Sequence, residues 1–246
     1  MLMPPTSGPF TLSLTQPIGG QLIESLRCRI VRGEIAPGMR LSEQDIADTY
    51  GLSRQPVREA FIRLAGEGLV EVRPQRGTYV RKISLQEVEA SRFVREAVEV
   101  EIARLAAVSG DAGLVSDLRS IVDEQARVRD RDALAFMQLD ERFHRRIAEG
   151  AGKAGAWSHL QPIKMHMDRV RYLTVLEFPL GRLVGEHRSI VEALARRDPG
   201  ATEAAIRLHL RGVLEDLPLI AAAQPDFFER ETDASVSDNQ PPGGNQ

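Results

Sequence analysis

Apolar residues recur with a helical period along most of the chain and with a strand period in one short segment. In the N-terminal part, the apolar stripe from Leu22 to Ile30 predicts a helix, and Pro37-Gly38 break it. Ser42 precedes a second, shorter amphipathic stretch, and its hydroxyl can cap the first helical turn. Ser53 precedes a third such stretch. The pattern therefore predicts three helices within the first third of the chain.

Two short segments of β type follow the third predicted helix. Residues 69–72 and 78–80 contain β-branched and aromatic side chains, and a link that contains Pro and Gly, residues 73–77, separates them. This spacing predicts a β-hairpin. Three helices followed by a hairpin is the element order of a winged helix-turn-helix domain, which we place at residues 16–82. Residues 1–15 are expected to form a flexible arm.

Residues 83–222 show helical patterning throughout and no strand signal. Glycine and proline positions divide this stretch into about six predicted helices, namely 84–108, 112–129, 131–149, 154–176, 179–197 and 199–222. Residues 223–246 carry five acidic residues against one arginine and end in Pro-Pro-Gly-Gly-Asn-Gln, so a disordered tail is expected. The fold class is therefore mainly α: an N-terminal winged helix-turn-helix and a C-terminal all-α helical bundle.

The composition is typical of a globular protein outside the membrane. Of 246 residues, 42% are hydrophobic and 27% are charged, and no run of about 18 apolar residues occurs, so we expect no membrane span. The first ten residues lack the basic and apolar regions of a signal peptide. Cys28 is the only cysteine, so no intrachain disulfide can form. A cytoplasmic location is expected.

Charge is segregated along the chain in the way that a local nucleic-acid site requires. The whole chain has a net charge of −3, which excludes overall electrostatic attraction to DNA. Residues 20–82, however, contain eleven Lys/Arg against eight Asp/Glu, a net charge of +3. A DNA-binding surface, with an association to the nucleoid, is therefore expected in the N-terminal domain alone.

The start of the third predicted helix carries the side chains that suit base recognition. The first residues of a recognition helix point into the major groove of DNA. Arg54 and Arg58 are four residues apart and so lie on one helix face, and an arginine can donate two hydrogen bonds to guanine. Ser53 and Gln55 can reach phosphates or base edges, and Arg76 lies at the tip of the hairpin. The alternative is a solvated helix face, which this order of elements disfavours.

Three histidines and one aspartate occupy apolar faces of three different predicted helices. Asp140 and His144 are four residues apart on one stripe, and His187 and His209 have core spacing on two other helices. Burying these groups is costly unless they are paired or bind a metal. A single such histidine is more often a hydrogen-bonded core residue. The joint placement of the four favours a site for a divalent transition metal.

The N-terminal motifs resemble those of the GntR family of transcription regulators. They are Arg32-Gly33-x-Ile35-x-Pro37-Gly38-x-x-Leu41-Ser42-Glu43, Ile46-Ala47, Ser53-Arg54-x-Pro56-Val57-Arg58-Glu59-Ala60, Arg63-Leu64-Ala65-x-x-Gly68-Leu69-Val70 and Pro74-x-Arg76-Gly77-x-x-Val80. The resemblance covers about 65 residues in order. By position, it implies DNA contacts from the second and third helices and from the wing tip, namely Gln44, Ser53, Arg54, Gln55, Arg58, Gln75, Arg76 and Gly77.

The C-terminal motifs resemble the ligand-sensing FCD domain of the FadR-like GntR subfamily, and their length suits its six-helix VanR-like variant. They are Arg95-x-x-Val98-Glu99-x-x-x-Ala103, Asp140-x-x-x-His144 and His187-x-x-Ile190-x-x-Ala193-Leu194-x-x-x-Asp198, followed by His209. The resemblance implies that the Asp and the three His bind a divalent ion, Zn or Ni, with a small carboxylate completing the coordination. It also implies that Arg95 pairs with the effector carboxylate. A surface position or an ion pair with Glu99 remains the alternative, and Arg169 and Arg171 are further candidates.

Together, these expectations predict a transcription regulator that responds to a metabolite and acts as a repressor. They do not predict an enzyme. A homodimer would place two recognition helices on the half-sites of a palindromic operator. Two alternatives remain. One is a DNA-binding dimeric protein whose helical domain has no effector. The other is an all-α metalloenzyme, although the sequence contains no HExxH motif and no evident general base.

Overall fold

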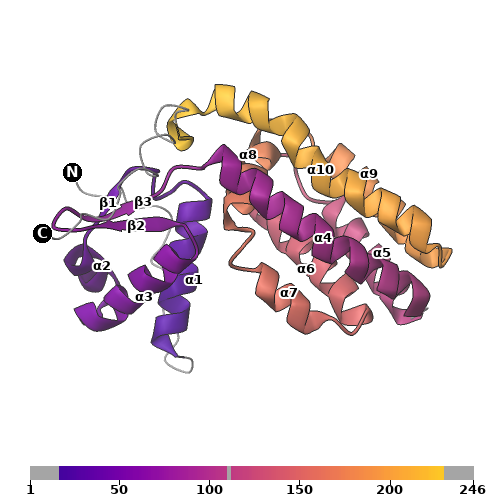
Figure 1. The fold of residues 1–246 in the computed structure, drawn as a ribbon, viewed down its shortest axis with the longest axis horizontal. Helices are drawn as coiled ribbons and strands as arrows, with labels where there is room; N and C mark the ends of the chain where they lie inside the picture. The colour runs from indigo at the N-terminus through magenta and orange to yellow at the C-terminus, as the bar shows by residue number, and fades with distance from the viewer. Residues whose placement is uncertain (1–16, 110–111, 230–246) are drawn as a thin grey trace, which may run out of the picture.

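The structure, a computed structural model, describes residues 17–109 and 112–229 (Figure 1). The expected arm at residues 1–15 and most of the expected tail, residues 230–246, lie outside the described residues. The N-terminal domain consists of α1 (Ile18–Val31), β1 (Arg40–Leu41), α2 (Glu43–Tyr50), α3 (Arg54–Gly66), β2 (Val70–Arg73) and β3 (Gly77–Val80). It has the predicted winged helix-turn-helix order, and the mainly α fold class is confirmed.

Local sequence signals position the helices of this domain. The hydroxyl of Ser42 accepts a hydrogen bond from the Asp45 amide at 3.2 Å and so caps α2, as predicted. Gly51 ends α2 in the left-handed conformation, with φ 65°. The predicted hairpin forms, and β3 also pairs with β1, so the antiparallel sheet has the order β1-β3-β2. The two-residue strand β1 was not predicted, because two residues are too few to show a period.

The C-terminal domain is a helical bundle of seven helices within the described residues, not six. They are α4 (Leu85–Ser109), α5 (Ala112–Gln125), α6 (Ala133–Gly150), α7 (Ala154–Leu160), α8 (Met165–Glu177), α9 (Gly181–Ala195) and α10 (Pro199–Ala223). The prediction of one helix over 154–176 is wrong, because α7 ends at Leu160 and α8 begins at Met165. Pro162 lies between them, and a proline cannot donate the backbone hydrogen bond that would continue the helix.

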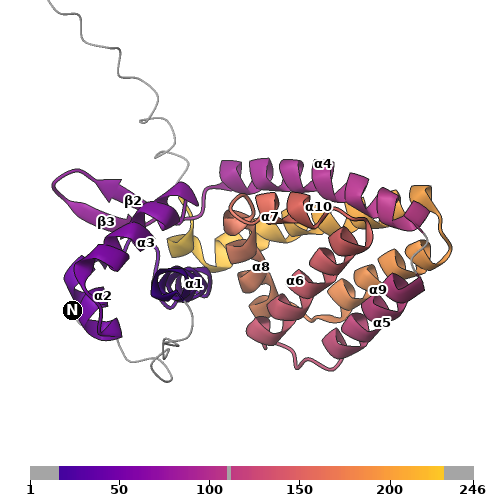
Figure 2. The same ribbon diagram turned by 90° about the horizontal axis from the view of Figure 1, so that it is seen from below.

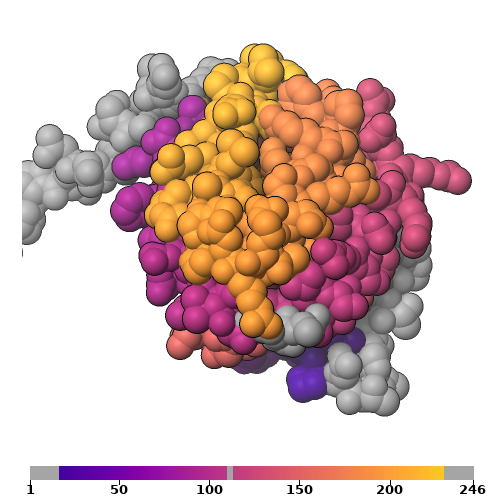
Figure 3. Space-filling model, turned by 90° about the vertical axis from the view of Figure 1, so that its right-hand side faces the viewer, coloured from indigo at the N-terminus to yellow at the C-terminus, as the bar shows by residue number. Residues whose placement is uncertain are grey.

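The long helices α4 and α10 lie side by side along one face of the bundle, and the other helices pack beneath them (Figures 1 and 2). At the end of the bundle remote from the N-terminal domain, α9 and α10 form adjoining surfaces (Figure 3). A separate hydrophobic core fills each domain. No helix in the described part of the chain is both long and apolar enough to cross a membrane.

The first residues of the expected tail are ordered against the rest of the molecule. Residues 225–227 form a 3-10 helix, and Phe228 pairs with Ile83 in an isolated parallel bridge. Phe227 lies against Gly33, where an added Cβ would come within 2.8 Å of its ring. Gly33 also has φ +71°, a conformation that favours glycine. Disorder at residues 224–229 was the wrong expectation, because aromatic side chains interrupt the acidic composition there.

A buried histidine lies where the two domains meet. His166 on α8 is 4% exposed and contacts the turn at Gly68 between α3 and β2. Burial, together with repulsion from the Arg169 and Arg81 guanidinium groups, lowers the pKa of His166 to about 4. The side chain is therefore neutral at physiological pH in this arrangement, and its pKa would return to its ordinary value on unfolding.

Replacing this histidine should make the stability of the protein less sensitive to acid. The unfolded chain binds the His166 proton more readily than the folded chain, so the free energy of unfolding falls as the pH drops from 6.5 towards 4. When the pH is lowered from 7.5 to 5, the free energy of unfolding of the wild type should fall by about 2 kcal/mol more than that of His166→Gln. Urea denaturation at both pH values measures this, with the exposed His159→Gln as control. Equal losses in the wild type and His166→Gln would contradict the assignment.

Candidate metal centre and nucleic-acid interface

The predicted recognition arginines lie at the start of α3 and reach solvent. The side chains of Arg54 and Arg58 are 58% and 56% exposed. Both donate hydrogen bonds to Glu43 on α2, Arg54 at 2.8 Å and Arg58 at 3.2 and 3.1 Å. These bonds hold the pKa of the Glu43 carboxyl below its usual range. The carboxylate therefore positions both arginines at the start of α3.

Glu43, which accepts hydrogen bonds from both arginines, is the residue of this surface that the sequence reasoning missed. It stood in the family motif without a role. The available signal was the position of Glu43 in the first turn of the second helix. In a helix-turn-helix, this turn packs against the next helix, where the two arginines lie. Ser53 and Gln55 are also exposed at the start of α3, and Gln44 is exposed in the first turn of α2.

The tip of the wing carries the remaining predicted contacts. Gln75 adopts φ 61° in the turn between β2 and β3, and Arg76 is exposed beside it. Gly77 adopts φ 109°, and an added Cβ there would lie 2.8 Å from Nε of Arg40. A requirement for glycine at position 77 therefore follows from the turn itself. A contact between Gly77 and DNA stays a prediction.

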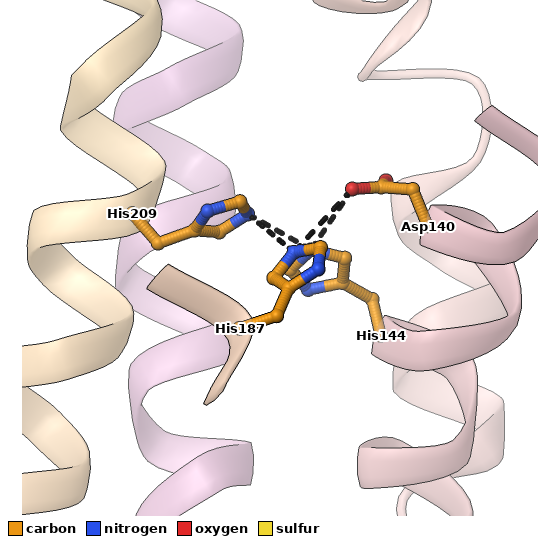
Figure 4. Close-up of side chains that lie close together, drawn as sticks. All are labelled: Asp140, His144, His187 and His209. Carbon is orange, nitrogen blue, oxygen red and sulfur yellow. Dashed lines mark hydrogen bonds and ion pairs between the residues drawn. The ribbon is translucent and has the colours of Figure 1, made fainter. Parts of the chain in front are cut away.

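The four predicted metal ligands converge in the core of the C-terminal domain (Figure 4). Asp140 and His144 come from α6, His187 from α9 and His209 from α10. All four side chains are buried, and one ligand atom from each lies within 4.8 Å of the others. His209 Nε2 lies 3.2 Å from His144 Nε2 and 3.3 Å from His187 Nε2. Asp140 Oδ1 lies 3.5 Å from His187 Nε2.

A second set of side chains contacts the three imidazoles at Nδ1, the ring nitrogen that points away from the cluster. His144 Nδ1 lies 2.8 Å from the Glu99 carboxylate, and His209 Nδ1 lies 2.8 Å from that of Glu186. His187 Nδ1 lies 2.7 Å from Oε1 of Gln125. Each Nδ1–H donates to its acceptor, which leaves the lone pair of each Nε2 facing the others. Sequence reasoning missed all three acceptors, because each lies on a different helix from the histidine that it contacts.

The geometry of the cluster fits a metal ion. Lone pairs of two Nε2 atoms only 3.2 Å apart repel each other unless a cation lies between them. Tetrahedral coordination with bonds of 2.0–2.1 Å separates the ligand atoms by about 3.3 Å. The distances from His209 Nε2 to His144 Nε2 and from His187 Nε2 to His209 Nε2 and Asp140 Oδ1 are close to this value, whereas His144 Nε2 lies 3.9 Å from Asp140 Oδ1. Burial lowers the pKa of His187 and of His209 well below the usual range, with the neighbouring imidazoles adding to the effect. The rings of His187 and His209 therefore stay neutral, as metal ligands must be.

Asp140 also holds a positively charged partner from a helix that the sequence did not connect to this site. Burial opposes ionisation of Asp140, but the guanidinium of Arg171 on α8 more than offsets it and holds the pKa of Asp140 far below the usual range. Arg171 donates a hydrogen bond to Asp140 Oδ1. The sequence suggested Arg171 only as a further partner for an effector carboxylate.

Arg95, the predicted effector contact, is buried at the edge of this cluster. It is 1% exposed, and its Nε donates to Glu99 at 2.5 Å, which is the alternative that the sequence left open. Its Nη2 is buried without a hydrogen-bond partner among the described residues. A small pocket beside the metal cluster is lined in part by Arg95, Arg171, Thr174 and His209. An effector role for Arg95 stays a prediction.

Comparisons with known proteins place this arrangement in a family. Residues 19–80 match the bacterial regulatory proteins of the gntR family, and residues 91–212 match the FCD domain. The HTH-type transcriptional repressor RspR of Escherichia coli K12 is 38% identical over 222 residues, which is 89% of this chain and 97% of that protein. An uncharacterized HTH-type regulator of Streptomyces ambofaciens is 37% identical, over 86% of this chain and 89% of that protein.

Solved structures agree on the fold. McbR/YncC of E. coli superposes with a TM-score of 0.70 at 16% identity, over 85% of this chain and 99% of that one. A GntR-type regulator from Rhodococcus sp. RHA1 gives a TM-score of 0.67 at 25% identity, over 81% of this chain and 97% of that one. The family consists of transcription regulators and not of enzymes, which answers the metalloenzyme alternative. The chain belongs to the GntR family of bacterial DNA-binding transcription regulators, with an N-terminal helix-turn-helix and a C-terminal FCD domain.

Proposed function

We propose that this protein is a metal-containing repressor that a small carboxylate or sugar acid releases from a palindromic operator. The observation that carries the proposal is the arrangement of the three imidazoles. Glu99, Gln125 and Glu186 fix each Nδ1, and every Nε2 faces Asp140 in one buried cluster. Histidines that only fill space in a core have no reason to direct their Nε2 atoms toward one shared point.

Operator recognition is assigned to the face shared by α2, α3 and the wing. Arg54 and Arg58 would read base edges in the major groove, and the helix N-terminus would favour a nearby phosphate. The exposed positions of these arginines support this role. The full set of proposed contacts is Gln44, Ser53, Arg54, Gln55, Arg58, Gln75, Arg76 and Gly77.

The sensor site is assigned to the metal cluster and the pocket beside it. Histidine and carboxylate ligands suit Zn or Ni. An acid effector would complete the coordination of the ion, and the guanidinium groups of Arg95 and Arg171 in the wall of the pocket would offset its charge. The effector must bind the two arrangements of the DNA-binding domains with different affinity, because only such a difference shifts their populations.

A homodimer is proposed because a palindromic operator needs two recognition helices related by two-fold symmetry. The paired helices α4 and α10 supply a surface for the contact. Phe93 on α4 is 66% exposed, and Leu208 and Leu219 on α10 are 63% and 60% exposed. Exposed large apolar side chains on neighbouring helices are candidates for a protein interface.

Binding to promoter fragments tests the proposal directly. At moderate salt, the purified protein should retard a fragment from beside its own gene at a concentration at least about 1,000-fold lower than that needed for bulk DNA. The complex should contain two chains, and bound metal should be found by elemental analysis. Carboxylic acids that raise the melting temperature should weaken the complex. Equal binding to both DNAs would refute the operator assignment, and binding that no acid alters would favour an effector-free DNA-binding dimer.

A further inference from the structure

Helix α8 contacts the DNA-binding domain and the metal cluster within a few residues. Met165 at its start is buried in the hydrophobic core of the N-terminal domain. Arg169 donates from Nη1 to the backbone oxygen of Arg81, just beyond β3, at 2.8 Å. Arg171, on the same helix, donates to Asp140 in the metal cluster. Because a helix rises about 1.5 Å per residue, only about 9 Å of one rigid element separates the two contacts.

Arg171 and a metal ion would compete for the same atom. Arg171 donates to Asp140 Oδ1, which is also the oxygen that lies 3.5 Å from His187 Nε2 and 3.9 Å from His144 Nε2. An ion held by the histidines would bind this oxygen at about 2.0–2.2 Å. The ion and the guanidinium are both cations, and the site is buried, so their repulsion at this distance is strong. Metal binding should therefore weaken the hold of Arg171 on Asp140.

The contact between α8 and the DNA-binding domain is only partly satisfied. In the described part of the chain, Nε and Nη2 of Arg169 are buried without a hydrogen-bond partner. Each of these atoms loses its hydration at the contact and gains no bond in exchange. The contact is therefore held less firmly than a fully paired one would be, and a small change at α8 can shift it.

An open groove provides room for such a shift. It has a volume of about 1130 Å³ and separates α1 and α3 of the DNA-binding domain from α6, α7 and α8. Cys28 on α1 and Asp168 on α8 are among the residues that line it on opposite sides. A movement of α8 relative to α1 would therefore change the width of the groove.

We propose that Arg171 is a latch that couples the metal cluster to the DNA-binding domain: metal binding displaces Arg171 from Asp140, and α8 then changes its position against that domain. The inference rests on the proposed metal site and adds the route by which that site acts. Arg171 is a positioning residue in this scheme, because it acts through Asp140 and through α8.

Zinc affinity tests the competition. In Arg171→Gln the competing cation is gone, so zinc should bind about 5-fold or more tightly than to the wild type, measured against a chromophoric chelator. Arg171→Lys keeps the charge and should fall between the two. Arg142→Gln is the matched control, because it removes the same charge from α6 close to Asp140, but Arg142 pairs with Glu124 at the surface. Its zinc affinity should equal that of the wild type.

The only cysteine of the chain reports the position of the domains. Cys28 is half-buried in the groove, so its rate of alkylation by N-ethylmaleimide depends on the groove width. Zinc should change this rate about threefold or more in the wild type and in Arg142→Gln. Arg171→Gln without zinc should already react at the rate of the zinc-loaded wild type, and zinc should add no further change.

Each outcome decides a separate point. A wild type that binds no zinc would refute the proposed metal site and the latch together. Zinc binding with equal affinity in the wild type and Arg171→Gln would refute the latch and leave the metal site standing. Tighter zinc binding in Arg171→Gln, with alkylation of Cys28 in the wild type indifferent to zinc, would refute the coupling to the DNA-binding domain.

Discussion

His144→Ala should purify with almost no bound metal, while the wild type should hold about one ion per chain after dialysis. His144 supplies one of four ligand atoms, and its Nε2 lies 3.2 Å from that of His209. Its loss also leaves the buried Glu99 without the imidazole that it accepts from. Loss of an outer-shell partner typically costs 10–100-fold in metal affinity, so removal of a ligand should cost at least about 100-fold. Elemental analysis of the dialysed proteins measures the result.

His159→Ala is the matched control for this experiment. His159 lies exposed on α7, away from the cluster, and its variant should keep the full metal content. His144→Gln, which retains a polar side chain of similar length, covers the case in which the alanine variant folds poorly. Full metal content in a folded His144 variant would contradict the proposed site. The metal-loaded wild type should also melt at a higher temperature than the dialysed protein treated with a chelator, because the ion binds only the folded chain.

Arg58→Ala should weaken binding to the operator by about 1–3 kcal/mol, or about 5- to 150-fold, and should leave binding to random DNA nearly unchanged. The reason is that an arginine that donates two bonds to a guanine discriminates among bases, whereas a phosphate contact does not. In the protein without DNA, Arg58 donates hydrogen bonds to Glu43, and these bonds hold its side chain at the start of α3. Titrations of operator and random fragments at one salt concentration measure the ratio.

Arg63→Ala provides the control on the same helix. Arg63 lies exposed in the last turn of α3, far from the base-reading end, so its variant removes an equal charge without removing a base contact. Its ratio of specific to random binding should match that of the wild type. If Arg58→Ala also keeps this ratio, Arg58 is excluded from base reading and contacts phosphate instead. A smaller salt dependence of binding would then be the remaining effect of the substitution.

Periodicity identified the four candidate ligands, because polar side chains stood at positions that the apolar period assigns to a core. Asp140 and His144 are one helical turn apart, and this spacing alone places them on one face. The partners of the histidines could not be found in this way. Glu99 and Glu186 occur among many acidic residues at ordinary helical positions, and Gln125 carries no charge at all. Only the packing of α4 on α6, of α5 on α9 and of α9 on α10 brings these three to the imidazoles.

Two further predictions were wrong, one for a reason that lies in the local sequence and one for a reason that lies far away in the chain. The break between α7 and α8 had a local signal in Pro162, which the continuous apolar pattern outweighed in the prediction. The order of residues 224–229 had a distant cause, because Phe227 contacts Gly33, 194 residues earlier in the chain, and Phe228 pairs with Ile83, 145 residues earlier. An acidic composition describes the average of a segment, whereas a buried aromatic side chain depends on its own neighbours.

The sequence by itself determined the order of the elements, the segregation of positive charge in the N-terminal domain, and the residues offered to DNA and to a metal. These depend on period, spacing and residue type, which are local properties. The tertiary structure alone decided that Glu43 holds Arg54 and Arg58, that Arg171 holds Asp140, and that α8 lies in contact with both domains. Each of these pairs comes from elements that meet only when the helices pack, so no local pattern carries them.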